Sequence, residues 1–314
     1  MREETRKFYG YFQREGFSPV NKDSYSIFKA YEQYSMLQEM GATIITAWSF
    51  AYNGLYKIIH GYLCSVYFYE GKNVYFALHR PLEPPEYSLR QIIDILYDLS
   101  MNAGLPSFQI KFIEERFIPE FQAVEGYAVK TAYFRDDCDY IYRNDEFIDL
   151  DGTINANKRK RINKCLKDKR ISFKDMTNKN IGICLDIEEY WCQKKDCSYC
   201  SSFSGCEKNA MKIMADIFDD RIYRGMFLCI DGDPSGYIIG EVINEKIAFA
   251  YFGKSLDKDH FVYCMYMMAK NWRHNAEYVN CNEDMGNMGI RVFKSHLGKY
   301  SLWNKYICEF KKKQ

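Results

Sequence analysis

The second half of the chain carries its clearest hydrophobic pattern. Residues 223–254 contain three runs with apolar side chains at alternate positions, separated by the polar turn sequences 231–236 and 244–246. A period of two is typical of half-buried strands, so these runs predict a three-stranded antiparallel meander. Helical spacing of apolar residues precedes the meander over 205–221 and follows it over 258–275.

The pattern after the meander completes a domain of mixed α/β class. It predicts a short strand at 276–281, a helix at 287–298 ending at Gly298, and a final strand at 301–310. The resulting order is helix, three antiparallel strands, helix, strand, helix, strand. This order resembles that of a GNAT-like acyltransferase domain, which implies a V-shaped cleft between the fourth and fifth strands.

The first half repeats this order more weakly. The pattern predicts helices and strands at 24–40 (helix), 55–78 (two or three strands), 87–104 (helix), 108–113 (strand), 115–121 (short helix) and 130–143 (strands). We therefore expect a tandem duplication of GNAT-like domains, with mixed sheets in both copies. The expected boundaries are 1–147 and 148–314, with a basic linker helix at about 155–170.

Composition narrows the functional classes. The 314 residues are 47% hydrophobic and carry a formal net charge of +1, which excludes a protein that coats nucleic acid with its whole surface. The sequence shows neither a signal peptide nor an apolar stretch long enough to span a membrane. The 12 cysteines are scattered through apolar runs. We therefore expect a cytoplasmic protein with reduced thiols.

A strongly basic segment covers residues 155–170 and contains eight Lys or Arg residues. As a helix it would show Lys158, Arg159 and Arg161 near one edge. Such a surface attracts phosphate groups through charge and guanidinium hydrogen bonds. The alternative interpretation is a solvated helix that joins two domains, and the residues leave both readings open.

Four cysteines are clustered in C-x4-C-x2-C-x5-C spacing, at Cys192, Cys197, Cys200 and Cys206. Four thiolates within a short span could form a tetrahedral zinc site, and the first three match one iron–sulfur ligation pattern. Only one C-x2-C pair is present, whereas strong zinc motifs have two. Free thiols therefore remain the leading interpretation, with zinc as a weak alternative.

The stretch from Tyr278 to Tyr300 has unusual polarity for its position. A strand ending at Asn280 leads into Glu283 and Asp284, two glycines follow, and Arg291 and Lys294 are spaced three apart on the next helix. One interpretation is a loop whose acids cap that helix. The other is an active site in which a carboxylate faces an amine while Arg and Lys hold an anion.

This same stretch resembles a signature of the phosphatidylglycerol lysyltransferase C-terminal-domain family. The signature reads Asn-x-x-Glu-Asp-x-Gly-x-x-Gly-Ile-Arg-x-x-Lys, here from Asn280 to Lys294. Residues 139–164 resemble a second mark of the family, and residues 249–257 resemble a third, which retains Lys254. Gly298 and His296 stand where the family usually has Pro and Tyr.

The resemblance implies an acyl- or aminoacyl-transferase whose second domain carries the reaction. It implies catalytic roles for Glu283, Asp284, Arg291 and Lys294, and substrate binding by Asn280, Lys254 and the basic helix. The expected donor bears phosphate, either aminoacyl-tRNA or acyl-CoA, and no cofactor is required. Contact with a lipid headgroup or membrane surface is also implied. The rival hypothesis is a non-catalytic double GNAT-like module that binds a polyanion or a protein partner.

The acyl-CoA alternative is weakened by one local feature. Residues 252–260 lack the glycine-rich turn that cradles a pyrophosphate at a helix N-terminus in acetyl-CoA enzymes.

Overall fold

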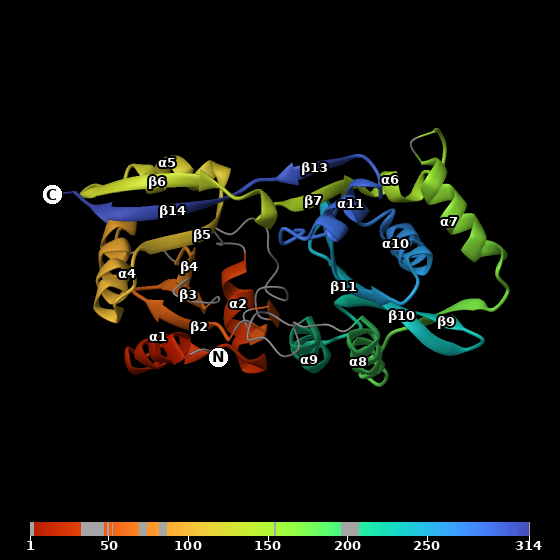
Figure 1. The fold of residues 1–314 in the computed structure, drawn as a ribbon, viewed down its shortest axis with the longest axis horizontal. Helices are drawn as coiled ribbons and strands as arrows, with labels where there is room; N and C mark the ends of the chain where they lie inside the picture. Colours follow the sequence, from red (N-terminus) through yellow and green to blue (C-terminus); the bar gives the residue numbers. More distant parts are fainter. Residues whose placement is uncertain are drawn as a thin grey trace. The chain divides into compact units, whose positions relative to one another are not determined.

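The computed structural model describes residues 3–32, 47–48, 50–51, 53–68, 74–81, 87–153, 155–195 and 207–313 (Figure 1). The chain forms two compact units that divide between Arg135 and Asp136, and residues from Asn304 onward return to the first unit. The sequence predicted a division into 1–147 and 148–314. The units instead change at residue 136, because β7 (Asp139–Arg143) belongs to the second sheet, and again at residue 304, because β14 (Lys305–Lys312) belongs to the first.

Each unit contains a seven-stranded mixed sheet. The first sheet has the order β1-β2-β3-β4-β5-β14-β6. Its strands are β1 (Ser18–Pro19), β2 (Leu55–Ile59), β3 (Tyr62–Phe68), β4 (Val74–His79), β5 (Phe108–Glu114), β6 (Tyr127–Tyr133) and β14 (Lys305–Lys312). The described helices of this unit are α1 (Glu3–Arg14), α2 (Tyr25–Tyr31), α4 (Leu89–Ala103) and α5 (Ile118–Gln122), with short 3-10 turns at Lys22–Ser24 and Glu115–Phe117.

The second sheet has the equivalent order β13-β7-β12-β11-β10-β9-β8. Its strands are β7 (Asp139–Arg143), β8 (Ile171–Asp175), β9 (Tyr223–Ile230), β10 (Asp233–Val242), β11 (Ile247–Ser255), β12 (Tyr278–Asn280) and β13 (Tyr300–Trp303). Its helices are α6 (Asn144–Ile148), α7 (Ala156–Lys167), α8 (Ile183–Lys195), α10 (Lys258–Trp272) and α11 (Met288–Ser295). Helix α9 (Glu207–Ile217) runs from one unit into the other. The meander, its flanking helices and the tandem GNAT-like fold are confirmed.

The two sheets exchange their last strands. β7 closes the first copy in sequence yet lies between β12 and β13 of the second sheet. β14 closes the second copy yet lies between β5 and β6 of the first sheet. The single strand expected at 301–310 was therefore wrong, because a break at Asn304 divides it into β13 and β14, which belong to different sheets.

In the second unit, alternate residues of the central strands point to opposite faces of the sheet, one covered by α10 and the other by α8. Ile238 on β10 packs into an apolar core with Met268 and Trp272 of α10. A Cβ at Gly240 would lie 2.4 Å from the Trp272 ring, so only glycine permits this close approach. The neighbouring Tyr237 points the other way, toward α8, and Figure 1 shows α8 and α10 on opposite faces of these strands.

The first unit has a core of its own between α1, α4 and the sheet, which includes Phe12, Phe76, Leu96 and Phe310. Its helix α4 begins at a capping box formed by Ser88 and Gln91 and ends at Gly104, whose φ is 82°. Within the described part of the chain, none of the helices combines the length and apolar character needed to cross a bilayer.

Candidate functional site

The second sheet opens between β11 and β12. These strands are parallel over three residue pairs, from Ile247–Tyr278 to Phe249–Asn280. β12 ends at Asn280, whereas β11 continues along β10 to Ser255. The loop that follows β12 therefore lies beside the part of β11 after Phe249, whose backbone groups do not pair with β12. In a GNAT-like sheet the fourth and fifth strands separate in this way.

The loop turns sharply through three residues with positive φ, namely Asn282 (56°), Met285 (51°) and Gly286 (72°). The Met285 N–H donates to the Asp136 carbonyl at 3.0 Å. The φ of 72° favours glycine at position 286, and a Cβ there would also approach the Asp136 carboxylate to 2.8 Å and displace it.

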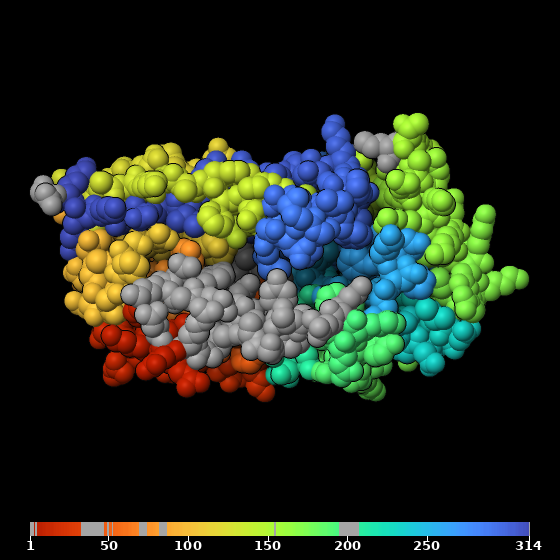
Figure 2. Space-filling model, in the orientation of Figure 1, coloured from red at the N-terminus to blue at the C-terminus, as the bar shows by residue number. Residues whose placement is uncertain are grey.

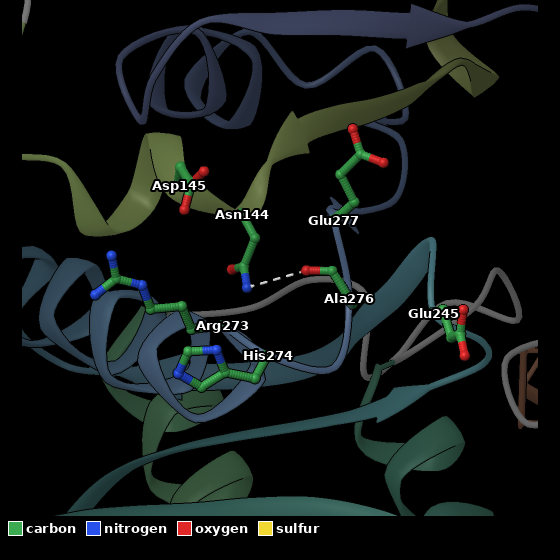
Figure 3. A pocket seen from close by; sticks show the side chains of 7 residues that line it. All are labelled: Asn144, Asp145, Glu245, Arg273, His274, Ala276 and Glu277. Carbon is green, nitrogen blue, oxygen red and sulfur yellow. Dashed lines mark hydrogen bonds between the residues drawn. The ribbon is translucent and has the colours of Figure 1, made fainter.

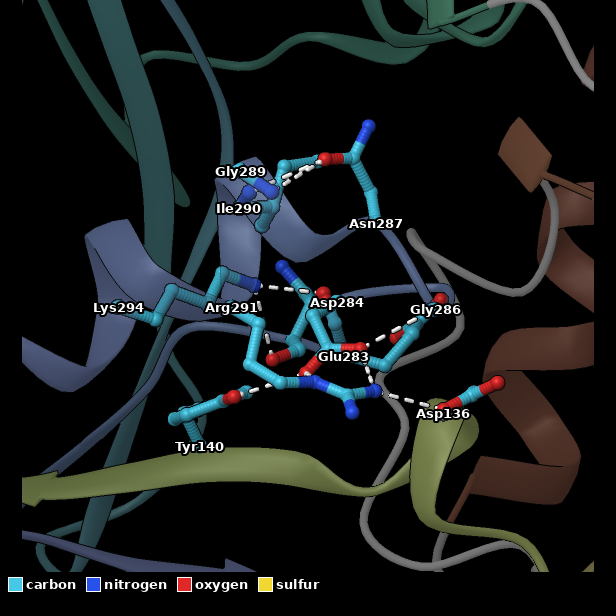
Figure 4. A network of polar contacts seen from close by, with 11 residues as sticks. Asp136, Tyr140, Glu283, Asp284, Gly286, Asn287, Gly289, Ile290, Arg291 and Lys294 are labelled. Carbon is cyan, nitrogen blue, oxygen red and sulfur yellow. Dashed lines mark hydrogen bonds and ion pairs between the residues drawn. The ribbon is translucent and has the colours of Figure 1, made fainter.

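Asp284 is the centre of a hydrogen-bond network in this loop (Figure 4). Its side chain is fully buried and accepts from the Tyr140 hydroxyl at 2.8 Å and the Gly286 N–H at 3.0 Å. Arg291 donates to both carboxylate oxygens, from Nε and Nη2, at 2.9 Å each. Such a two-pronged, charge-assisted pair fixes the geometry of both side chains.

Arg291 also joins the loop to the short 3-10 turn (Arg135–Asp137) that precedes β7. Its Nη2 donates to Asp136 Oδ1 at 2.6 Å, and the side chain is 28% exposed. The carboxylates of Asp284 and Asp136 both raise the pKa of the Arg291 guanidinium. The guanidinium is thus committed to Asp284 and Asp136, and a substrate anion would have to compete with them.

Lys294 holds the backbone of the same loop. Its Nζ donates to the carbonyls of Cys281 (2.6 Å), Asn282 (3.0 Å) and Glu283 (2.6 Å) and lies 5.4 Å from the centre of the Tyr140 ring. Burial lowers the pKa of Lys294. These contacts satisfy three carbonyls that the turn leaves outside regular secondary structure.

Asn280 and Asn282 attach the loop to the neighbouring strands. The buried Asn280 donates to Asp139 Oδ2 at 3.0 Å and accepts from the Asn282 N–H at 2.7 Å. Asn282 Nδ2 donates to the Ala250 carbonyl of β11 at 2.8 Å. Six polar residues were singled out in the sequence between β11 and α11. The structure brings five of them together in the loop or directly against it, namely Asn280, Glu283, Asp284, Arg291 and Lys294, and the sixth is Lys254 of β11.

Lys254 occupies a different face. It projects from β11, and its Nζ lies 4.4 Å from the centre of the Trp191 ring of α8. Its cross-strand partner Tyr237 donates a hydrogen bond to Glu188 of α8. Lys254 therefore belongs to the side of the sheet that α8 covers.

Two buried glutamates on that side were missed in the sequence. Glu188 is 1% exposed and accepts from Tyr237, and Glu241 is 3% exposed and accepts from the Tyr251 hydroxyl at 2.9 Å. Both tyrosines and Glu241 belong to the central strands β10 and β11. For Glu241 the sequence did offer a signal, because it is the single acidic residue in the otherwise apolar run from Ile238 to Val242. Glu188 lies on helix α8, where this signal is absent.

The basic helix is α7, and the three cations singled out on it bind their own fold. Lys158 is buried, donates to the Glu146 carbonyl and has a pKa lowered by burial. Arg159 donates to the carbonyls of Leu150 and Gly152. Arg161 lies 3.4 Å from Asp259 of α10. α7 is at the surface of the second unit (Figure 2), and its phosphate-binding role stays a prediction.

The N-terminus of α10 is already occupied by a carboxylate. The Asp257 side chain accepts from the Asp259 N–H at 2.7 Å. Such a cap satisfies an N–H group that would otherwise be available to a phosphate, and its negative charge repels one.

Of the cysteine cluster, only Cys192 is among the described residues, where it is half-buried. Cys197, Cys200 and Cys206 lie outside them. The described ranges contain no group of three or more His, Cys, Asp or Glu side chains that could hold a metal ion. The zinc alternative for the cluster therefore stays untested.

The family model described as phosphatidylglycerol lysyltransferase, C-terminal, matches residues 47–284 of this chain. A search of proteins with curated descriptions gave no match.

Solved structures with the same fold include proteins from two bacteria. A conserved protein of unknown function from Bacteroides thetaiotaomicron has a TM-score of 0.77 and 18% identity, covering 94% of this chain and 99% of its own. L-PGS from Bacillus licheniformis has a TM-score of 0.61 and 13% identity, covering 95% and 94%. At these identities the likeness shows the shared fold.

Proposed function

Because the chain belongs to the family of phosphatidylglycerol lysyltransferase C-terminal domains, we propose that it transfers an aminoacyl or acyl group from an activated donor to a hydroxyl or amine acceptor. One observation carries the proposal. The carboxylate-bearing loop after β12 is held by hydrogen bonds beside Ala250 of β11, one residue past the point where the parallel ladder ends. A rigid polar loop beside an open strand edge suits an acyl-transfer site, since such reactions depend on positioned groups.

The loop residues divide into two roles. Asp284, Arg291 and Lys294 are positioning residues, because their polar atoms hold the loop and one another. Glu283 is the carboxylate that we assign to the substrate. It is half-buried in the same loop, whereas Asp284 is fully buried within the network.

The reaction would proceed by direct attack. The acceptor oxygen or nitrogen forms a bond to the donor carbonyl carbon, and the bond from that carbon to the donor's leaving group breaks. Glu283 takes the acceptor's proton or holds the ammonium of the aminoacyl group. Lys254, which projects on the side of the sheet that α8 covers, is assigned to the donor's phosphate and not to the reacting carbonyl. The proton finally passes to the departing donor hydroxyl or thiol.

Between the two donors, we favour aminoacyl-tRNA. Acyl-CoA would place its diphosphate at the α10 N-terminus in a GNAT-like fold, and there Asp257 already caps the helix. The acceptor class is left open between a lipid hydroxyl, a peptide amine and a small metabolite.

Donor turnover by the purified protein tests the proposal. We would incubate it with a mixture of tRNAs charged with labelled amino acids, or with acyl-CoAs, together with phosphatidylglycerol vesicles and amine acceptors. We expect the wild type to consume the aminoacyl ester only when an acceptor is present. Glu283→Gln should not consume it. Saturable tRNA binding without loss of either donor would instead favour a non-catalytic module that binds a polyanion.

A further inference from the structure

Trp191 of α8 places an aromatic ring against the side chain that we assign to the donor's phosphate. The Lys254 Nζ lies 4.4 Å from the centre of this ring. Both side chains are half-buried, so the pair is neither sealed in the core nor fully exposed. At this distance an ammonium is attracted to the electron-rich face of an indole, which is the strongest aromatic partner for a cation.

A second contact between the same helix and the same strand pair determines where the ring lies. Glu188 precedes Trp191 by three residues, so both side chains project from one face of α8. Glu188 is buried and accepts a hydrogen bond from the Tyr237 hydroxyl. Tyr237 is in turn the cross-strand partner of Lys254. The buried hydrogen bond therefore holds α8 at the position where Trp191 meets Lys254.

The ring contact prepares Lys254 to bind an anion. A lysine side chain has a flexible four-carbon stem, and holding its ammonium in one place costs conformational entropy. A contact that already exists in the free protein reduces the part of this cost that falls on ligand binding. The indole carries no net charge, so this contact does not itself neutralise the ammonium. A carboxylate partner, such as Asp259 beside Arg161, would do so.

The position of Lys254 along β11 suits a phosphate that lies away from the reacting ester. The loop that carries Glu283 is tied to β11 at Ala250, through Asn282 Nδ2. Lys254 lies four residues further along the same strand, or about 13 Å at the usual rise per residue. The polar pocket beside Glu245, shown in Figure 3, adjoins the opposite end of β11 and is not part of this site. A polynucleotide donor carries phosphates at intervals, so one can meet Lys254 while the terminal ester lies at the loop.

We propose that Trp191 is a positioning residue for the donor, because its ring holds the Lys254 ammonium where a donor phosphate binds. The proposal rests on the transfer reaction proposed above and adds a residue that sets the affinity for the donor. Trp191 acts through Lys254 and not on the reacting ester. Its loss should therefore weaken donor binding and leave the chemical step unchanged.

Steady-state kinetics with aminoacyl-tRNA test this division. Trp191→Leu should raise the KM for the charged tRNA about three- to tenfold with kcat unchanged, whereas Trp191→Phe keeps an aromatic face and should recover most of the affinity. Tyr190→Leu is the matched control. It removes the neighbouring, exposed ring of α8, which has its own lysine contact 5.6 Å from Lys194 Nζ, and should keep the wild-type KM. An equal rise in KM in Tyr190→Leu would mean a general effect on α8 and would overturn the proposal.

A double-mutant cycle with uncharged tRNA tests whether Trp191 acts through Lys254. Lys254→Met alone should weaken binding, and adding Trp191→Leu should weaken it no further, because the ring then has no ammonium to hold. Additive losses, or unchanged binding in Trp191→Leu, would refute the positioning role even if the wild type transfers aminoacyl groups. Coupled losses without any transfer would refute the proposed reaction and retain the role of Trp191. A wild type that binds no tRNA would overturn both.

Discussion

The two sheets share one strand order but differ in what they bury. On the face toward α2, the first sheet buries Ser65 and His79, whose side-chain polar atoms lack hydrogen-bond partners in the described chain. On the face toward α8, the second sheet buries Glu188 and Glu241, each bonded to a tyrosine. At these positions the first sheet holds neutral polar groups and the second holds carboxylates, and the charged side chains that the first sheet buries (Lys111, Glu114 and Lys305) lie on β5 and β14.

The loops after the parallel strand pair differ in the same sense. In the first sheet β5 leads directly into Glu115–Phe117 and α5. In the second, β12 leads into a turn stabilised by Asp284, Arg291 and Lys294. The comparison teaches that the fold alone does not make a site, and that the chemistry depends on the loop that each copy carries.

The largest expected effect comes from Asp284→Ala. The change leaves Arg291, the Tyr140 hydroxyl and the Gly286 N–H without their shared acceptor, so we expect a loss of about 3–5 kcal/mol in the free energy of unfolding, together with loss of transfer. Urea denaturation measures the first effect. A variant with unchanged stability would show that the network is not structural.

His79 provides the next largest effect and tests the first sheet. Burial lowers its pKa from 6.5 to about 3, so the unfolded chain binds a proton that the folded chain rejects between these values. Stability should therefore be fully present above pH 6.5 and fall by about 1.4 kcal/mol per pH unit below it.

His79→Leu should remove this part of the pH dependence, because Phe28 and Tyr31 already surround the ring with apolar contacts. Ser65→Ala, on the same face, is the matched control and should keep the wild-type slope. Urea midpoints at pH 7 and pH 5 decide the matter, and an unchanged slope in His79→Leu would contradict the neutral, buried state.

Lys294→Met should have an intermediate effect of about 1–3 kcal/mol, because three loop carbonyls lose an ammonium donor. Hydrogen exchange should increase in residues 281–287 and stay constant in β9 and β10. Uniform acceleration across the second sheet would mean that Lys294 supports the whole unit and not only the loop.

Much of this organisation was readable in the sequence. Alternation and turn residues located the meander, and the polarity of the stretch from Asn280 to Lys294 drew attention to the loop in which the structure holds these side chains. The strand exchange was not readable, because hydropathy shows that residues 139–143 and 305–312 form strands but not which sheet pairs with them. Long-range pairing depends on tertiary packing.

The basic helix shows why charge alone misleads. Lys158 lies four and seven residues before Ile162 and Cys165, so all three share the buried face of α7. Its stem packs inward while its ammonium meets a backbone carbonyl. The helical spacing indicated that Lys158 lies on the buried face, but the high density of charge in this segment favoured the interpretation that its side chain is exposed.

The smallest expected effect is that of Arg161→Gln. Its ion pair with Asp259 is partly exposed, so the loss should be under about 1 kcal/mol. If α7 binds phosphate, Lys160→Gln with Lys167→Gln, both exposed, should reduce tRNA affinity more than Arg161→Gln does. A salt titration of binding checks this order, and the reverse order would place the phosphate contact at Arg161.

The central claim is that the loop of the second sheet, and not that of the first, carries the transfer reaction. The most direct test compares donor turnover in Glu283→Gln with turnover in Glu115→Gln, which alters the corresponding loop of the first sheet. Both variants should melt within about 2 °C of the wild type, since neither residue is fully buried. The account predicts that Glu283→Gln loses aminoacyl transfer while Glu115→Gln retains it. Full turnover by Glu283→Gln would contradict the account.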